Sequence, residues 1–193
     1  MIAGLALAGG RSRRLGGGDK PLLRIGGRSM LDRVLEVLAT EAEAVAISAN
    51  GDPSRFAAFG RPVLPDGEFA GSGPLAGVLA GLDWAAGLGA ETLLTVPGDT
   101  PFVRAGLAAA LAPAPACAES NGVRHYLVAL WPVGVRSALR SALSAGAPRS
   151  VGRFAAEIGA RSVVFPALPC DPFLNVNTPE ELAAARAVAE STA

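Results

Sequence analysis

Glycines and cations gather in a short segment near the N-terminus, in a pattern that suits phosphate binding. The apolar run Ile2–Leu7 predicts a buried strand, and residues 9–20 then hold five glycines together with Arg14 and Lys20. Glycines let backbone N–H groups approach an anion closely, and guanidinium and ammonium groups neutralise phosphate oxygens. Such a loop after the first strand is where α/β proteins commonly hold a nucleotide. We therefore expect a nucleotide site here, with a basic surface turn as the alternative.

Two common phosphate-binding motifs do not account for this loop. A P-loop needs Ser or Thr directly after its lysine, whereas Pro21 follows Lys20. The dinucleotide pattern G-x-G-x-x-G does not directly follow the first predicted strand either. The sequence therefore excludes both of these nucleotide-binding classes.

Asp99 is the candidate metal ligand. It comes at the end of an apolar run, in the segment Val96-Pro97-Gly98-Asp99-Thr100-Pro101. Ligands of open α/β sheets bind at the carboxyl ends of the strands, and one carboxylate can hold Mg²⁺ when substrate phosphates supply other ligands. Capping a helix is the alternative role, for which Thr100 is the better candidate. We expect Asp99 to bind Mg²⁺ and to serve in catalysis together with Arg14 and Lys20.

Two asparagines near the C-terminus, Asn175 and Asn177, are separated by one residue. On a short strand, such residues point to the same side. Their amides can both donate and accept hydrogen bonds, which suits a polar ligand such as a pterin or a second phosphate. An Asx turn that starts the last predicted helix is the alternative, and Asn177 can serve both purposes.

The elements that must position these residues alternate along the chain. Short apolar runs follow stretches rich in alanine and leucine, which predicts an α/β fold with a mostly parallel sheet. Ser29 and Thr178 are placed to cap the first and last predicted helices, the latter within a capping box. The predicted strands are Ile2–Leu7, Ala44–Ser48, Pro62–Leu64, Thr92–Val96, His125–Trp131 and Ser162–Phe165. The predicted helices are Met30–Glu41, Pro74–Ala86, Arg104–Leu111, Val135–Ala145, Val151–Ile158 and Pro179–Ala189.

The length of 193 residues predicts a single domain. The proline-containing stretch 112–115 reads as a loop between a nucleotide half, about 1–112, and a second half, about 113–193. We do not interpret it as a domain linker, because neither half could close a core alone. The whole chain, 1–193, is therefore expected to form one unit.

Composition excludes several classes of partner. The formal charge is zero and aromatic residues are 5% of the chain, so neither nucleic acid nor a membrane surface is expected as a partner. No run approaches the length of a membrane span. Cys117 and Cys170 do not have metal-ligand spacing, and we expect two reduced thiols in a cytoplasmic protein.

Four blocks of the sequence resemble the molybdenum cofactor guanylyltransferases, in that family's order and over nearly the whole chain. The resemblance implies a Rossmann-like three-layer α/β/α sandwich of the nucleotide-diphospho-sugar transferase type. The four blocks are Leu7-Ala8-Gly9-Gly10 with Arg14-Leu15-Gly16-Gly17 and Asp19-Lys20, Pro74-Leu75-Ala76-Gly77, Pro97-Gly98-Asp99-Thr100-Pro101, and Asn175-Val176-Asn177-Thr178-Pro179-Glu180-Glu181-Leu182.

The resemblance also implies site residues. It places Asp66 and a polar residue of the segment 48–50 at the nucleotide, and Asp99 at Mg²⁺. A carboxylate can accept hydrogen bonds from N1–H and the exocyclic amine of guanine, and Asn50 can meet O6, although both residues can also be turn residues. The residues implied in nucleotide and cofactor binding are Leu7, Ala8, Gly9, Gly10, Lys20, Asn50, Asp66, Asp99, Asn175 and Asn177.

The implied reaction transfers GMP from GTP to the terminal phosphate of molybdenum-loaded molybdopterin and releases pyrophosphate. Proteins that load molybdopterin or mature molybdoenzymes are the implied partners. The alternatives are a cytidylyltransferase acting on the same pterin, a sugar-phosphate nucleotidyltransferase and a non-catalytic nucleotide-binding protein that delivers the cofactor. Gly10 and the C-terminal asparagines favour the guanylyl branch of the family, and Lys20 with Asp99 argues against loss of catalysis.

Overall fold

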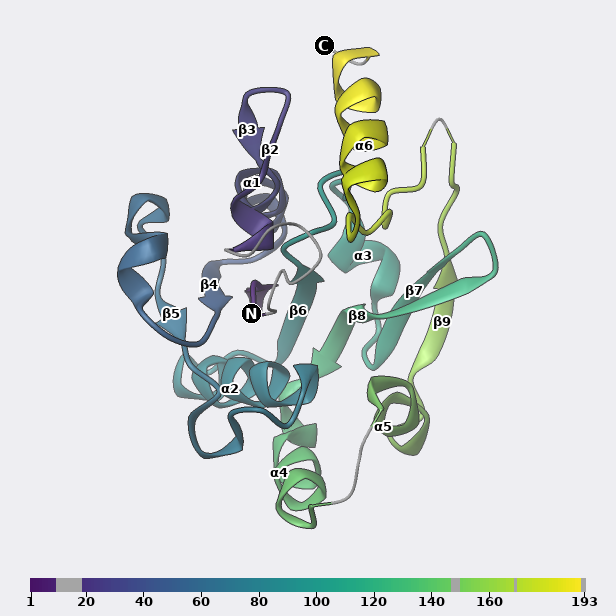
Figure 1. Cartoon of the computed structure of the whole chain (residues 1–193). Coiled ribbons are helices and arrows are strands. Elements are labelled where there is room, and N and C mark those ends of the chain that lie inside the picture. Colours follow the sequence, from purple (N-terminus) through teal and green to yellow (C-terminus); the bar gives the residue numbers. More distant parts are fainter. Residues whose placement is uncertain (10–18, 147–149, 169, 192–193) are drawn as a thin grey trace.

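A computed structural model describes residues 1–9, 19–146, 150–168 and 170–191 of the chain. Its centre is a seven-stranded sheet with the order β5-β4-β1-β6-β8-β7-β9 (Figure 1). Strand β8 runs antiparallel to both β6 and β7, and the other four neighbouring pairs are parallel. The strands are β1 (Ile2–Leu7), β4 (Ala44–Ser48), β5 (Val63–Leu64), β6 (Thr92–Pro97), β7 (Ala116–Ser120), β8 (Val123–Pro132) and β9 (Arg161–Val164).

Helices cover both faces of the sheet and complete three layers, which confirms the predicted fold class. Helices α1 and α3 pack on one face, and α2, α4 and α5 pack on the other (Figure 1). The bounds are α1 (Met30–Glu41), α2 (Pro74–Gly87), α3 (Leu107–Leu111), α4 (Arg136–Ser144), α5 (Val151–Glu157) and α6 (Pro179–Ser191). Short 3₁₀ segments are η1 (Lys20–Leu22), η2 (Pro53–Phe59), η3 (Gly67–Phe69) and η4 (Val133–Val135).

Strand β1 shows how the sequence builds this core. Leu5 and Ala6 are fully buried neighbours that face opposite sides of the sheet, so an uninterrupted apolar run is needed here. The following helix, α1, begins at a capping box: the Ser29 hydroxyl accepts from the Asp32 backbone N–H at 3.0 Å, and the Asp32 carboxylate accepts from the Ser29 N–H at 2.9 Å. The predicted cap at Ser29 is confirmed.

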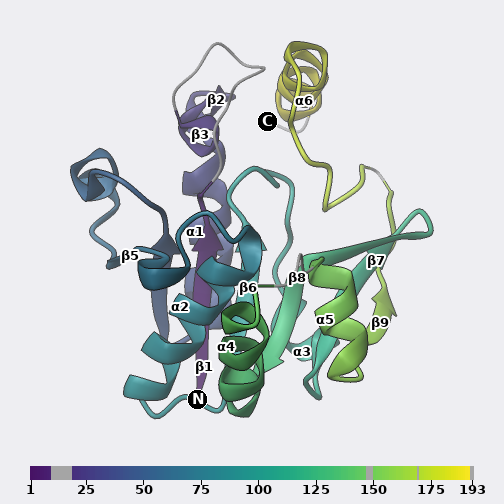
Figure 2. The ribbon, with the colours of Figure 1, turned by 60° about the horizontal axis from the view of Figure 1, so that its bottom comes forward.

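The last helix does not belong to either layer. Figure 2 shows α6 beyond the carboxyl end of β1, near the small hairpin of β2 (Arg24–Ile25) and β3 (Arg28–Ser29). Buried Ile25, Val176 and Ala185 form a separate apolar cluster between the helix and the hairpin. This cluster holds the chain's C-terminal part at the edge of the sheet where β1 ends.

Several boundaries differ from the sequence prediction. Strand β7 was not predicted, because its sequence Ala-Cys-Ala-Glu-Ser lacks the branched and aromatic residues typical of strands. Helix α3 begins at Leu107 instead of Arg104, since the Glu41 carboxylate accepts from the backbone N–H groups of Gly106 at 2.5 Å and Ala108 at 2.8 Å. The segment 174–178 is assigned to no strand and has a bend at Thr178, so the expected short strand there is wrong.

Both core clusters contain residues from each predicted half. Val96 and Val128 share one cluster, while Leu5 and Trp131 share the other. Cys117 is buried, and no disulfide joins it to Cys170. Among the described helices, none has the length and hydropathy required to cross a membrane.

Candidate active site

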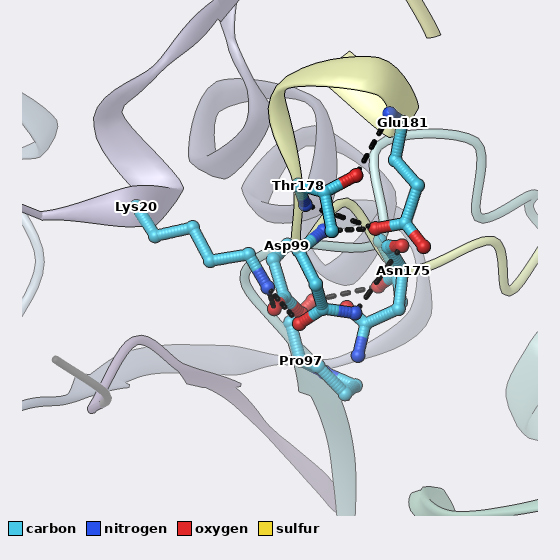
Figure 3. Close-up of polar contacts among 8 residues, drawn as sticks. Lys20, Pro97, Asp99, Asn175, Thr178 and Glu181 are labelled. Carbon is cyan, nitrogen blue, oxygen red and sulfur yellow. Dashed lines mark hydrogen bonds and ion pairs between the residues drawn. The ribbon is translucent and has the colours of Figure 1, made fainter. Parts of the chain in front are cut away.

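Four side chains from three distant parts of the sequence meet at the carboxyl edge of the sheet, and we call them the charge cluster: Lys20, Asp99, Asn175 and Asn177. The Lys20 ammonium forms an ion pair with the Asp99 carboxylate and donates to Asn177 Oδ1 at 2.6 Å (Figure 3). With its amide nitrogen turned toward Asp99, Asn175 donates to Oδ2 of that carboxylate at 2.8 Å. The side chains of Lys20 and Asp99 are only 14% and 17% exposed, so water screens their attraction weakly.

Close packing of the chain around Gly98 brings the side chains of Lys20 and Asp99 together. The backbone N–H of Gly98, just beyond β6, donates to the Leu7 carbonyl at the end of β1 at 2.9 Å. A Cβ on Gly98 would stand 3.1 Å from Cβ of Pro21, so a larger residue here would require Pro21 to shift by a few tenths of an ångström. Thr100 donates to the Pro97 carbonyl at 2.6 Å and caps no helix. Local turns therefore fix the carboxylate without a helix N-terminus.

Asn175 and Asn177 are positioned by a backbone hydrogen bond to the end of β6 and by the capping box of α6. The backbone N–H of Val176 donates to the Asp99 carbonyl at 3.2 Å and joins the segment to the end of β6. Glu181 Oε2 accepts from the N–H groups of Asn177 at 2.5 Å and Thr178 at 3.0 Å, and the Glu181 N–H donates to the Thr178 hydroxyl at 3.2 Å (Figure 3). The predicted capping box of the last helix is confirmed, and it places Asn177 beside Lys20.

A second group of residues, the carboxylate pocket, consists of Ser48, Asn50, Asp66 and Gly77. Asn50 Nδ2 donates to Asp66 Oδ2 at 2.6 Å, and the Asp66 backbone N–H donates to Asn50 Oδ1 at 2.9 Å. The reciprocal pair fixes the Asp66 carboxylate. Among the described residues no cation forms an ion pair with Asp66, and the partner of its carboxylate there is the Asn50 amide.

Gly77 lets helix α2 approach this pocket. A Cβ on Gly77 would stand 2.5 Å from the Ser48 hydroxyl oxygen and 3.4 Å from Asp66 Oδ1. The first distance is far shorter than real contacts of a Cβ, so a larger residue would force either the Ser48 hydroxyl or the first turn of α2 to move. This role explains the glycine of the block Pro74-Leu75-Ala76-Gly77.

The end of β1 lies between the charge cluster and the carboxylate pocket. The Leu7 carbonyl accepts from Gly98 on one side, and the Ala8 N–H donates to the Ser48 carbonyl at 2.9 Å on the other. Gly9 follows and is exposed. Two predicted site residues, Gly10 and Arg14, lie outside the described residues.

Sequence reasoning missed one residue that contacts both the carboxylate pocket and the residue that precedes Lys20. Arg55, in η2, forms an ion pair with Asp19 and donates to the Asn50 carbonyl at 2.6 Å. A lone arginine in a polar loop gives no sequence signal of such a role. The Asp19-Lys20 pair, in contrast, was visible within the glycine-rich segment.

His125 supports the C-terminal segment from the other side. Its Nε2 lies 2.8 Å from the Ser120 hydroxyl, which donates to Asp171 Oδ1 at 2.8 Å, and its ring packs against Phe173. Burial lowers the pKa of His125 from its ordinary value of 6.5, against an opposing effect of Asp171. These contacts hold residues 171–173 just before the segment that carries Asn175.

The charge cluster suits a metal ion that arrives with a substrate. Among the described residues, no three His, Cys, Asp or Glu side chains gather as a preformed metal cage. Asp99 instead offers one carboxylate at a strand end and already binds a cation, the Lys20 ammonium. A single carboxylate is a typical protein contribution to Mg²⁺ bound to nucleotide phosphates. The residues therefore fit Mg²⁺, and the site as a whole can position and neutralise a phosphorylated ligand.

Comparison with known proteins agrees with this chemistry. The model of the MobA-like NTP transferase domain matches residues 4–163. Molybdenum cofactor guanylyltransferase of Acidiphilium cryptum (strain JF-5) is 55% identical over 186 residues, which cover 96% of this chain and 94% of that protein. The protein of the same name from Cereibacter sphaeroides is 50% identical, with 97% and 96% covered.

Solved structures confirm the fold. Molybdopterin-guanine dinucleotide biosynthesis protein A from Archaeoglobus fulgidus has a TM-score of 0.74 at 19% identity, with 99% of this chain and 100% of that chain covered. 2-C-methyl-D-erythritol 4-phosphate cytidylyltransferase from Thermus thermophilus has a TM-score of 0.65 at 17% identity, with 98% of each chain covered. The architecture is thus shared among nucleotidyltransferases, and the full-length sequence identity decides the family. This chain belongs to the molybdenum cofactor guanylyltransferases.

Proposed function

We propose that this protein transfers GMP from GTP to the terminal phosphate of molybdenum-loaded molybdopterin. A phosphate oxygen of the pterin attacks the α-phosphorus of GTP, the bond to the β-phosphate oxygen breaks, and pyrophosphate leaves. The product is the guanine dinucleotide form of the cofactor. The observation that carries this proposal is the 55% identity to a guanylyltransferase over 96% of the chain. Relatives at this level do not favour the cytidylyltransferase or non-catalytic alternatives.

The charge cluster fits the requirements of phosphoryl transfer. The attacking group is already an anion, so catalysis depends on position and charge neutralisation more than on a nucleophile–base pair. We assign Lys20 and Arg14 to the triphosphate, and the backbone of Leu7, Ala8, Gly9 and Gly10 to the same ligand. Asp99 would hold Mg²⁺, which when bound supplies charge stabilisation at the phosphate oxygens.

The carboxylate pocket is assigned to the base. Guanine offers two adjacent donors, N1–H and the exocyclic amine, and a carboxylate fixed in place can accept both. Asp66 is oriented for such a role by its two hydrogen bonds with Asn50. We therefore assign base recognition to Asp66, with Asn50 beside it.

Asn175 and Asn177 are assigned to the phosphate side of the second substrate. Both are tied to the Lys20–Asp99 pair, where the pterin phosphate must meet the α-phosphorus. We further propose that the protein works in the cytoplasm with proteins that load molybdopterin and mature molybdoenzymes. Cell fractionation and affinity capture under mild conditions would test these two points.

Pyrophosphate release tests the main proposal. The purified protein is supplied with GTP, CTP or ATP, Mg²⁺ and molybdenum-loaded molybdopterin, and the dinucleotide product is identified by mass. We expect release with GTP that requires the pterin. Preference for CTP would overturn the base assignment, and tight GTP binding without product would overturn the enzymatic assignment.

A further inference from the structure

Arg55 uses all three of its guanidinium nitrogens on fixed acceptors. Nε donates to the Asp52 carbonyl at 2.9 Å, Nη2 donates to the Asn50 carbonyl at 2.6 Å, and Nη1 forms the ion pair with Asp19. The guanidinium carbon also lies 5.1 Å from the ring centre of Phe56, which is fully buried. The planar fork is thus held in one orientation, which a lysine could not reproduce.

Two acceptors of Arg55 lie next to or within the two parts of the nucleotide site: Asp19 precedes Lys20, and Asn50 belongs to the carboxylate pocket. Asp19 directly precedes Lys20, whose ammonium reaches Asp99 and Asn177 in the charge cluster. Asn50 holds the Asp66 carboxylate with its side chain, while its own carbonyl accepts from Arg55. One side chain therefore connects the segment that carries Lys20 with the loop that carries the carboxylate pocket.

We propose that Arg55 is a positioning residue that holds the phosphate end and the base end of the nucleotide site at a fixed separation. The inference rests on the proposed function, because it requires GTP to span the two groups. A ligand gains affinity when its two contact regions are already at the right distance, since less conformational freedom is lost on binding. The Arg55 side chain is 35% exposed, so water partly screens its ion pair with Asp19 and lowers the contribution of the pair to stability. Arg55 should therefore affect nucleotide recognition more than folding.

Three variants of the full chain separate the contributions of the hydrogen bonds, the charge and the ion pair of Arg55. Arg55→Met keeps an apolar stem over Phe56 and removes every donor. Arg55→Lys keeps the charge and loses the fork. Asp19→Asn removes the ionic partner and leaves the bond from Arg55 to the Asn50 carbonyl. Arg61→Met, at an exposed arginine just after η2, is the matched control.

Binding of GTP, ITP, GMP and CTP with Mg²⁺ is measured by displacement of a fluorescent GTP analogue. ITP lacks the exocyclic amine, so the GTP-to-ITP ratio reports the base end, and the GTP-to-GMP ratio reports the phosphate end. We expect Arg55→Met to weaken GTP about tenfold, the scale of one charge-assisted hydrogen bond, and to lower both ratios. Asp19→Asn should lower only the GTP-to-GMP ratio. Arg55→Lys should lie between Arg55→Met and the natural protein.

The double variant Arg55→Met with Asp19→Asn distinguishes positioning from direct contact. If Arg55 acts on the phosphates through Asp19, the losses in the GTP-to-GMP ratio are less than additive. Fully additive losses would overturn the proposal, because Arg55 would then touch the phosphates itself. Thermal unfolding of each variant should stay close to that of Arg61→Met.

Other results of the binding measurements would contradict a positioning role for Arg55. If Arg55→Met keeps both ratios, or if Arg55→Lys equals the natural protein, then fixed geometry at Arg55 is not required and the inference alone fails. If the natural protein itself does not prefer GTP to ITP and CTP, the proposed function fails and this inference falls with it.

Discussion

The charge cluster and the carboxylate pocket satisfy their acidic residues in opposite ways. In the charge cluster, Asp99 meets a cation and an amide that come from residues 20 and 175. In the carboxylate pocket, Asp66 is held by the side chain of Asn50, only sixteen residues away, and no cation pairs with it in the described parts of the chain. The Asp99 carboxylate has a cationic partner, Lys20, that a ligand must displace or share. The Asp66 carboxylate is held by a neutral amide, so its negative charge can still attract a ligand's hydrogen-bond donors.

This difference corresponds to two kinds of recognition. A metal ion and a triphosphate can replace the Lys20–Asp99 contact by new ionic contacts, so charge is exchanged and no buried group is left unpaired. The planar base instead needs acceptors that are already in place, because misplaced hydrogen bonds give little discrimination. We therefore expect variants of the charge cluster to change turnover and phosphate or metal binding, and variants of the carboxylate pocket to change the choice of base.

Loss of the carboxylate in the charge cluster should have the largest effect. Asp99→Asn keeps the size of the side chain and removes its charge, and we expect turnover to fall about a thousandfold. Pyrophosphate release across a range of Mg²⁺ concentrations measures this, with Asp83→Asn on the surface of α2 as the control. Near-normal turnover across the whole range of Mg²⁺ concentrations would show that Asp99 is only a turn residue.

Loss of charge in the carboxylate pocket should change the choice of base. Asp66→Asn should cost roughly 1.5–3 kcal/mol in GTP binding, the range for hydrogen bonds to charged groups, and leave ATP binding unchanged. Competition between GTP, CTP and ATP measures the effect in the natural protein and the variant. An equal loss for all three nucleotides would mean that the base is recognised elsewhere.

Removal of the ammonium should move metal and nucleotide affinity in opposite directions. Lys20 is the only lysine in the chain. Lys20→Met should weaken GTP about tenfold, whereas Mn²⁺ alone should bind more tightly because Asp99 loses its internal cation. Titration with Mn²⁺, followed by its magnetic resonance signal, gives the metal affinity without nucleotide. A parallel loss of both affinities would contradict an exchange of partners at Asp99.

Lys20→Arg tests whether a positive charge alone is sufficient at this position. It keeps the charge, but a planar guanidinium does not match the compact contacts of an ammonium with Asp99 and Asn177. We expect GTP binding to recover only in part. Full recovery would show that charge alone is needed at this position.

Packing beneath the carboxylate pocket can be broken and then restored. Gly77→Ala places a methyl group against the Ser48 hydroxyl and should destabilise the protein by about 1–3 kcal/mol, the usual cost of overpacking. Adding Ser48→Ala removes the oxygen, so stability should return. Denaturant unfolding of the single and double variants measures this rescue. An unaltered Gly77→Ala protein would show that α2 adjusts freely.

The smallest predicted effect concerns the support of the C-terminal segment. Because burial lowers the pKa of His125 in the folded state, the unfolded chain binds its proton more tightly. Stability from this group is complete above the ordinary value of 6.5 and is lost as the pH falls below it. The groups facing the ring are Ser120, Asp171 and Phe173. Unfolding temperatures of the natural protein and His125→Gln, compared on both sides of that pH, should differ in slope, and parallel curves would contradict this.

The sequence predicted the fold well wherever one local signal decided the structure. Strands β1 and β4 and helix α1 have the predicted bounds, because apolar runs and a capping box mark them. Strand β7 escaped prediction since its pairing with β8 and β9, and not its residue types, makes it a strand. Lys20, Asp99 and the asparagines were predicted as site residues from the sequence, but their mutual contacts depend on how the sheet edge is assembled. Arg55 could not be predicted from the sequence, because its contacts with Asp19 and Asn50 arise only in the folded chain.

The backbone hydrogen bond from Val176 to the Asp99 carbonyl joins the asparagine segment to the sheet. Because this segment comes late in the chain, the bond can form only late in synthesis. The sheet and its covering helices are complete in residues that leave the ribosome before the asparagine segment does. A nascent chain can therefore form the carboxylate pocket and the Lys20–Asp99 pair while Asn175 and Asn177 are still inside the exit tunnel. The residues assigned to the base can therefore assemble before the full charge cluster, which requires the asparagine segment to emerge.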